Sequence, residues 1–130
     1  MFLQSEWVER DEQIDVVNPF NGEAFDSVPA ATVEDVTAAV DGLVEGAKVM
    51  AAMPASRRCE ILRKAAVLLC EHEEEIGRII STEEGKILAE AKGEVRKGAN
   101  IVEFIAGEAR RMNGQTIPSE LSNNFAYALR

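Results

Sequence analysis

Residues 87–113 read ILAEAKGEVRKGANIVEFIAGEARRMN, and this stretch decides the fold class. Its apolar or small residues recur at steps of three and four, at Leu88, Ala91, Val95, Gly98, Val102, Ile105, Ala109 and Met112. Those steps match the helical turn of about 3.6 residues, so the stretch predicts one long helix with a single apolar face. Gly114 is expected to close this helix.

The same spacing predicts three further helices upstream. The first begins near Thr32, whose hydroxyl can cap it, and presents Val33, Val36, Val40, Leu43, Ala47 and Met50. The second runs from Pro54 to about Glu71 and presents Ile61, Leu62, Ala65, Leu68 and Leu69. After a break at the acidic residues 73–75, the third presents Ile76, Ile79 and Ile80 and stops at Gly85. Aromatic residues are scarce and alanine is abundant, which favours closely packed helices.

Strands are expected at both ends of the chain. Phe2, Leu3, Trp7 and Val8 indicate one or two short strands, and residues 14–17 and 24–28 indicate a hairpin that turns at Asn21-Gly22. Residues 125–129 alternate in polarity and predict a last strand, which we expect to need a pairing partner from outside this chain. The predicted fold class is mostly α, with short N-terminal β-hairpin strands and a C-terminal strand.

Composition excludes several classes of function. The chain has 130 residues, at most one domain, and a net charge of -9 without any cluster of basic residues. We therefore expect neither a nucleic-acid partner nor a membrane partner. The longest purely apolar run covers only residues 65–70, whereas a bilayer span needs about 20 residues. Glu6 and Glu9 interrupt any signal-peptide pattern, so a cytoplasmic location is expected.

The two cysteines and the single histidine are the first candidates for chemistry. Cys59 and Cys70 stand eleven residues apart in one predicted helix, about 16 Å along its axis and too far for a disulfide. We expect both to be reduced, half-buried structural thiols, although Cys59 follows Arg57-Arg58 in a way that could activate it. His72 has no Cys or His nearby, so we interpret it as a surface or kink residue rather than a metal ligand.

Carboxylates form the remaining candidate cluster. Glu83, Glu84, Glu90 and Glu94 lie near Lys86 and Lys92, and steps of four place Lys86, Glu90 and Glu94 on one predicted face. We interpret this cluster as a solvated ion-pair face rather than a general acid–base pair. The glycines form no phosphate-binding loop. We predict no catalytic residue, no cofactor-binding residue and no metal ligand in this chain.

The order of several weak motifs carries a family resemblance. They are Val17-Asn18-Pro19-Phe20-Asn21-Gly22, Thr32-Val33-Glu34-Asp35-Val36, Thr82-Glu83-Glu84-Gly85-Lys86 and Asn113-Gly114-Gln115-Thr116-Ile117-Pro118. Together they resemble the N-terminal region of the NAD(P)-dependent aldehyde dehydrogenase superfamily over essentially the whole chain. Ala47 and Met50 stand where many members have Phe and Trp, which resembles the lactaldehyde, succinate-semialdehyde or non-phosphorylating glyceraldehyde-3-phosphate branches.

The resemblance implies a piece of the α/β aldehyde dehydrogenase fold, flanking a Rossmann-like domain. Residues 1–124 would form the N-terminal part of the nucleotide-binding domain, with strands at about 1–30 and helices at about 32–113. Residues 125–130 would begin the oligomerisation arm. The whole enzyme would use NAD or NADP to oxidise an aldehyde to an acid through a cysteine nucleophile, a glutamate and an asparagine, all C-terminal to this region. That nucleophile's role is not transferred to Cys59 or Cys70.

For this chain alone, the resemblance implies no cofactor and no activity. Its partners would be the remainder of the dehydrogenase and further copies, which would contact it through the strand Phe125–Arg130 or through exposed helix faces. The alternative is a free-standing helical interaction module without a catalytic parent. The unfinished strand after Ala126 argues against that alternative.

Overall fold

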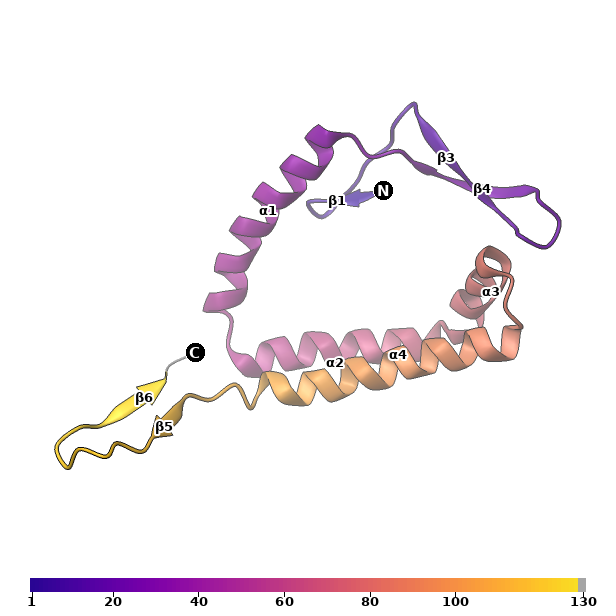
Figure 1. Ribbon diagram of the computed structural model, residues 1–130. Helices are drawn as coiled ribbons and strands as arrows, with labels where there is room; N and C mark the ends of the chain where they lie inside the picture. The colour runs from indigo at the N-terminus through magenta and orange to yellow at the C-terminus, as the bar shows by residue number, and fades with distance from the viewer. Residues whose placement is uncertain (129–130) are drawn as a thin grey trace.

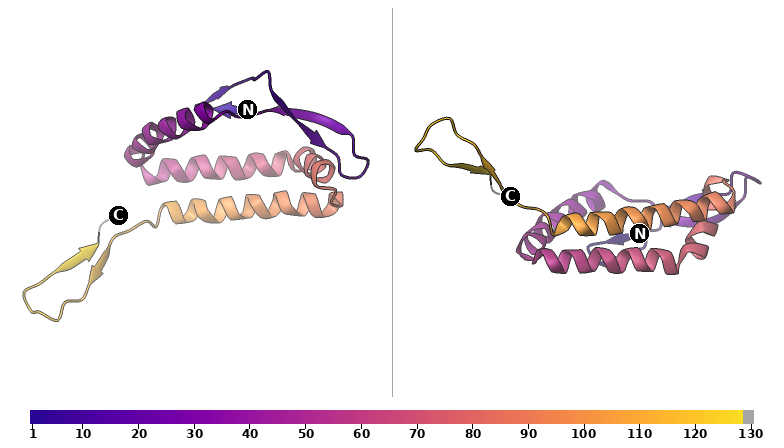
Figure 2. Two further views of the ribbon diagram at one scale, coloured as in Figure 1. Left: turned by 45° about the horizontal axis from the view of Figure 1, so that its top comes forward. Right: turned by 90° about the horizontal axis from the view of Figure 1, so that it is seen from below.

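The computed structural model describes residues 1–128 and contains the four predicted helices. They are α1 (Val33–Ala52), α2 (Ala55–Glu71), α3 (Glu73–Glu84) and α4 (Leu88–Ala109). In Figure 1, α2 and α4 lie side by side along their length and α3 packs against the start of α4, whereas α1 stands apart beside the N-terminal strands. The second pair of views shows the same arrangement (Figure 2). The prediction of a mostly helical chain with short terminal strands is confirmed.

Small side chains form the contact between α2 and α4. On α4 the buried residues are Ala91, Val95, Ala99 and Ala106, and on α2 they are Cys59 and Ala66. Small residues let two helix axes approach closely, as the alanine-rich composition predicts. The predicted apolar face of α4 is partly wrong, because Ile105 and Met112 are 49% and 59% exposed. The buried stripe follows steps of four through Ala91, Val95 and Ala99 instead.

The starts and breaks of the helices follow the predicted signals. Thr32 caps α1 in a capping box, in which its hydroxyl accepts a hydrogen bond from the Asp35 amide and Asp35 accepts one from the Thr32 amide. Gly85 ends α3 in the left-handed conformation with φ +73°. The break between α2 and α3 falls at His72, so the acidic residues 73–75 form the first turn of α3 rather than the break itself.

The predicted end of α4 is wrong by four residues. The helix stops at Ala109 rather than Asn113, and Gly114 does not close it. Beyond Ala109 the backbone changes to tighter bonds, from the Arg111 amide to Glu108 O (2.8 Å) and from the Asn113 amide to Arg111 O (2.8 Å). Met112 is exposed, so continuing the helix would gain no apolar burial there.

All the strands occur in three separate antiparallel pairs. β1 (Phe2–Leu3) pairs with β2 (Glu6–Trp7), and β3 (Gln13–Val17) pairs with β4 (Ala24–Pro29). The β3–β4 turn contains Gly22 at φ +75°, where the sequence predicts a residue with positive φ. The predicted N-terminal strands and hairpin are therefore confirmed.

The C-terminal strand is paired within the chain, which corrects the expectation of an outside partner. β5 (Gln115–Ile117), which was not predicted, pairs with β6 (Ala126–Ala128). The segment between them reverses the chain and supplies the ladder that the last strand needs. The predicted strand over 125–129 is thus shorter in the structure, and Leu129 and Arg130 lie outside the described residues.

Candidate functional site

The clearest polar cluster joins the N-terminal strands to α1. Asp35, only 7% exposed, receives hydrogen bonds from both the Nε and Nη2 atoms of Arg10 and from the amide and hydroxyl of Thr32. Arg10 and the Thr32 amide stabilise the carboxylate and lower the pKa of Asp35 from 3.8 to about 2. Every acceptor of this carboxylate is used for anchoring, so the cluster is structural.

A second contact fixes the same segment on α1. The Gln4 side chain donates to the Ala38 carbonyl at 2.6 Å and crosses α1 at Gly42. A Cβ at Gly42 would lie 2.9 Å from Cγ of Gln4, so only glycine allows this approach. Neither contact leaves a free reactive group.

The two candidate thiols lie in different environments. Cys59 is 2% exposed between α2 and α4, so a substrate cannot reach its sulfur. Cys70 is exposed and lines a groove together with Glu71, Asn100 and Glu103. Both are free, as predicted, but the expectation that each is half-buried is wrong: the α4 contact covers one completely and leaves the other open.

His72 occupies the break between two helices. Its ring is exposed, and its Nδ1 lies 2.9 Å from Oε2 of Glu75 in the next turn. This position confirms the interpretation of His72 as a surface or kink residue. Within residues 1–128, no group of three His, Cys, Asp or Glu side chains is arranged to hold a metal ion.

The lysine–glutamate cluster forms ion pairs between elements rather than along one helix. Lys86 lies before α4 begins, and its Nζ is 2.6 Å from carboxylate oxygens of both Glu84 and Glu94, which raise the pKa of the lysine. Lys92 of α4 reaches Glu74 of α3 at 2.5 Å and lowers the pKa of that carboxyl.

The interpretation of this cluster as a partly solvated ion-pair face is therefore confirmed, whereas its placement on a single helical face is wrong. Glu83 and Glu90 are exposed. The turn at Gly85 places Lys86 outside α4, so the step of four does not apply to it.

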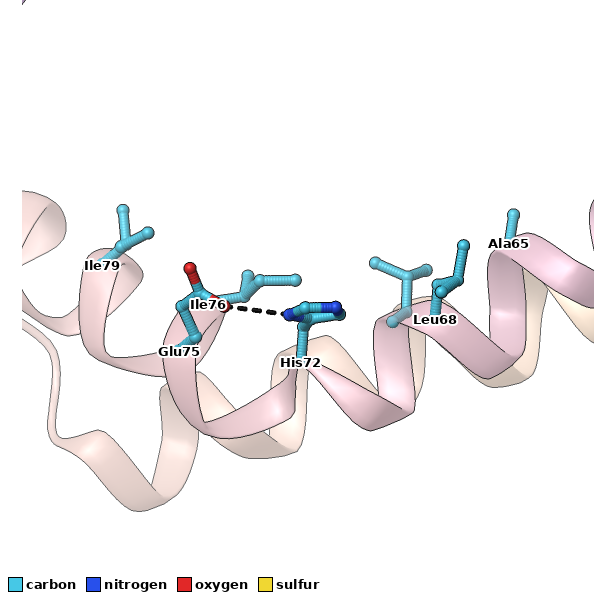
Figure 3. Close-up of a pocket in the computed structure, with 7 residues that line it drawn as sticks. Ala65, Leu68, His72, Glu75, Ile76 and Ile79 are labelled. Atoms are coloured by element: carbon cyan, nitrogen blue, oxygen red, sulfur yellow. Dashed lines mark hydrogen bonds and ion pairs between the residues drawn. The ribbon is translucent and has the colours of Figure 1, made fainter.

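The widest candidate binding surface is apolar. We define the apolar face as one side of the helical bundle, made of Ile61, Ala65 and Leu68 of α2, Ile76 and Ile79 of α3, and Ile105 and Met112 of α4. One groove of about 490 Å³ runs between α2 and α3 past His72 and Glu75, whose side chains project to the same side as the apolar residues (Figure 3). A second groove, of about 300 Å³, lies between α2 and α4 and also contacts Met50, Arg58 and Glu108.

The other side of the bundle is polar. We define the ion-paired face by Arg63, Val67 and Cys70 of α2 with Asn100 and Glu103 of α4. Arg63 Nε lies 3.1 Å from Glu103 Oε1 across the two helices. Arg96 pairs with Glu73 at 3.2 Å further along the same helix. Charged groups on this side therefore have partners within the chain.

The described residues do not fit a dinucleotide. Such a site needs a strand, a glycine-rich turn and a helix N-terminus next to a parallel sheet. In residues 1–128 every strand pair is antiparallel, and no strand leads through such a turn into a helix. None of the helices described has the length and apolarity to cross a bilayer.

Comparisons with known proteins extend this geometry. Residues 7–130 match the model described as the aldehyde dehydrogenase family. The chain is 38% identical over 118 residues to the succinate-semialdehyde dehydrogenase [NADP(+)] GabD of Escherichia coli, covering 89% of this chain and 24% of that protein. It is 41% identical over 120 residues to malonate-semialdehyde dehydrogenase 2 of Oceanobacillus iheyensis, covering 91% of this chain and 25% of that protein.

The fold of the chain is also found in solved structures. The crystal structure of an aldehyde dehydrogenase from Brucella melitensis biovar abortus matches with a TM-score of 0.92 and 33% identity, covering 97% of this chain and 26% of that one. The expected piece of a larger α/β fold is thereby confirmed. The chain spans about a quarter of the length of the curated relatives it matches.

Proposed function

Because the chain belongs to the aldehyde dehydrogenase family, we propose that it forms the N-terminal region of an NAD(P)-dependent enzyme that oxidises an aldehyde to a carboxylic acid. The observation that supports this most strongly is the family match over residues 7–130, together with the shared fold at a TM-score of 0.92. Single motifs in this region are weak, whereas their order and their shared three-dimensional arrangement are specific.

We propose that residues 1–124 are the N-terminal part of the nucleotide-binding domain and carry no catalytic, cofactor-binding or metal-binding residue. The antiparallel hairpins do not fit NAD or NADP, so residues outside this chain would bind the cofactor. Cys59 is buried and supports no reaction with substrate. The 130-residue chain alone is then inactive.

For the substrate, we propose a semialdehyde, an aldehyde that carries a carboxylate at its other end. Two relatives at 38% and 41% identity are named for succinate semialdehyde and malonate semialdehyde. Ala47 and Met50 agree with the succinate-semialdehyde branch. The residues that choose among these substrates would lie outside the chain.

We also propose that the enzyme is a cytoplasmic homo-oligomer. The β5–β6 hairpin extends away from the helices, and Phe125 and Tyr127 on it are 76% and 60% exposed (Figure 1). A two-stranded ribbon has unpaired outer edges, which suits it to an arm between subunits. Residues 125–130 would begin this arm.

The test compares two polypeptides. One is the 130-residue chain, and the other is the product of the longest reading frame that contains it. Each is assayed with succinate semialdehyde, malonate semialdehyde and acetaldehyde, with NAD+ or NADP+, by the absorbance of the reduced nicotinamide. We expect turnover only by the longer product, and a faster reaction with the semialdehydes.

Two results would count against the proposal. Turnover by the purified 130-residue chain would contradict the assignment of catalysis to residues outside it. A reading frame that stops at Arg130, or a longer product inert with all three aldehydes, would favour the free-standing interaction module.

A further inference from the structure

The apolar face is continuous over three helices. Ile61, Ala65 and Leu68 follow helical steps of four and three along α2, and Ile76 and Ile79 extend the surface onto α3. Leu68, Ile79 and Ile105 are 44%, 49% and 49% exposed. A soluble monomer seldom leaves so many large apolar side chains together in contact with water, so this face is a binding surface.

The ion-paired face gives no such signal. Arg63 and Glu103 satisfy each other across α2 and α4, and the pairs of Arg96 and Lys92 with α3 continue the same side. Covering these charges would remove them from water at a cost that the pairs only partly offset. The two sides of one bundle therefore differ in their need for a partner.

Charge and length together identify the partner of the apolar face. Relatives have about three quarters of their length outside the matched region, which is enough polypeptide to cover two grooves. A second copy suits the face less well, because Glu75 and Glu108 border the grooves and the chain has a net charge of -9. Two identical faces in contact would bring these carboxylates together.

We infer that the remaining polypeptide of the same dehydrogenase docks on the apolar face through an apolar segment, while the ion-paired face stays in solvent. This inference rests on the proposed function. The bundle already has the conformation found in a solved aldehyde dehydrogenase, so docking needs little rearrangement of α2, α3 and α4.

Val67 and Leu68 provide a matched test one residue apart. Val67 lines the groove on the ion-paired face and is 55% exposed, whereas Leu68 lines the groove on the apolar face and is 44% exposed. Val67→Cys and Leu68→Cys are each made with Cys70→Ser in the longer polypeptide. The rate of maleimide labelling is then measured in the folded protein and in the same protein unfolded in urea.

We expect folding to slow the labelling of Leu68→Cys by at least about 100-fold and that of Val67→Cys by no more than about fivefold. In the protein without substitutions, Cys70 should react while buried Cys59 does not. Equal labelling at positions 67 and 68 in the folded protein would overturn the inference. Protection of position 68 that is lost on dilution to a monomer would assign the face to a second copy and also overturn it.

Two measurements protect this result from a folding defect. Circular dichroism must show unchanged helix content in both variants, and Ile79→Cys on α3 provides a second position on the same face. Dehydrogenase activity is measured separately. A protected apolar face in a product without activity would contradict the proposed function but not the docking, and the reverse result would contradict the docking alone.

Discussion

Helices α1 and α4 are similar in length and both have an apolar stripe, yet they are held in place by different interactions. α4 buries Ala91, Ala99 and Ala106 against neighbouring helices. α1 buries only Asp35, and its Val33 and Leu43 are 77% and 72% exposed. A regular apolar spacing therefore predicts that a helix forms, but does not show whether its partner lies in the same chain.

Polar contacts replace apolar packing at both ends of α1. Arg10 and Thr32 hold Asp35 at its start, and the Arg58 guanidinium donates to the carbonyls of Met50 and Met53 at its end. Such contacts fix the ends of a helix without burying its face. Changes in the bundle should therefore lower the stability of the whole helical unit, whereas changes at α1 should have local effects.

The largest effect is expected from overpacking the α2–α4 contact. Ala99→Leu adds a branched side chain at a position that is 2% exposed, and should lower the free energy of unfolding by about 1–3 kcal/mol. Urea unfolding followed by circular dichroism measures the change. The control is Lys97→Leu on the exposed side of α4. Equal stability of the two variants would mean that the bundle does not depend on this contact.

The next effect is expected at the turn between α3 and α4. Gly85→Ala places a side chain at φ +73°, with its Cβ 3.0 Å from Cγ of Pro19, and should cost about 1–2 kcal/mol. Gly93→Ala lies in the middle of α4 with no atom within 4 Å of the new Cβ. That control should stabilise the chain by about 0.5–1 kcal/mol. The same urea titration compares the two, and a stabilised Gly85→Ala variant would contradict the geometry at Gly85.

A smaller effect, confined to α1, is expected on acidification. The pKa of Asp35 is lowered to about 2, so its ionised form stabilises the native state fully above about pH 4. This contribution is lost as the pH falls towards 2 and the carboxylate takes up a proton. Amide exchange of Asp35 and Val36 should accelerate over that interval, measured by NMR, while the amide of Ala99 is less affected. In Asp35→Asn the acceleration should be absent; if it persists, another carboxylate is responsible.

The smallest effect is expected on the ion-paired face. Arg63 and Glu103 are about half exposed, so Arg63→Ala should change the free energy of unfolding by no more than about 0.5 kcal/mol. The change should shrink further in high salt. A loss as large as that of Ala99→Leu would show that this pair, rather than the small buried side chains, holds α2 on α4.

Local signals explain what the sequence predicts well. Thr32 and Gly85 mark helix ends through the conformation or hydrogen bond of one residue, and both ends are where the sequence places them. The end of α4 is not predicted, because Met112 continues the spacing but has nothing to pack against. β5 is missed because a three-residue strand has too few alternating positions to be detected.

Choosing the buried stripe needs information that a single helix does not contain. Ile105 fits the predicted face of α4 as well as Ala99 does, and only the position of α2 decides that Ala99 is covered. For the same reason the sequence predicts apolar faces but does not distinguish the apolar face from the stripe inside the bundle. The environments of Cys59 and Cys70, one buried and one open, differ through the same contact.

The way α4 ends also affects how the chain would respond to a protease. The adjacent residues Arg110 and Arg111 are exposed where the helix stops, and the hairpin beyond them extends away from the rest of the molecule (Figure 2). Trypsin cutting at this pair would release the hairpin as a small peptide without breaking any hydrogen bond inside α2 or α3. The ribbon and the helices are thus separable pieces, joined by a short and accessible hinge.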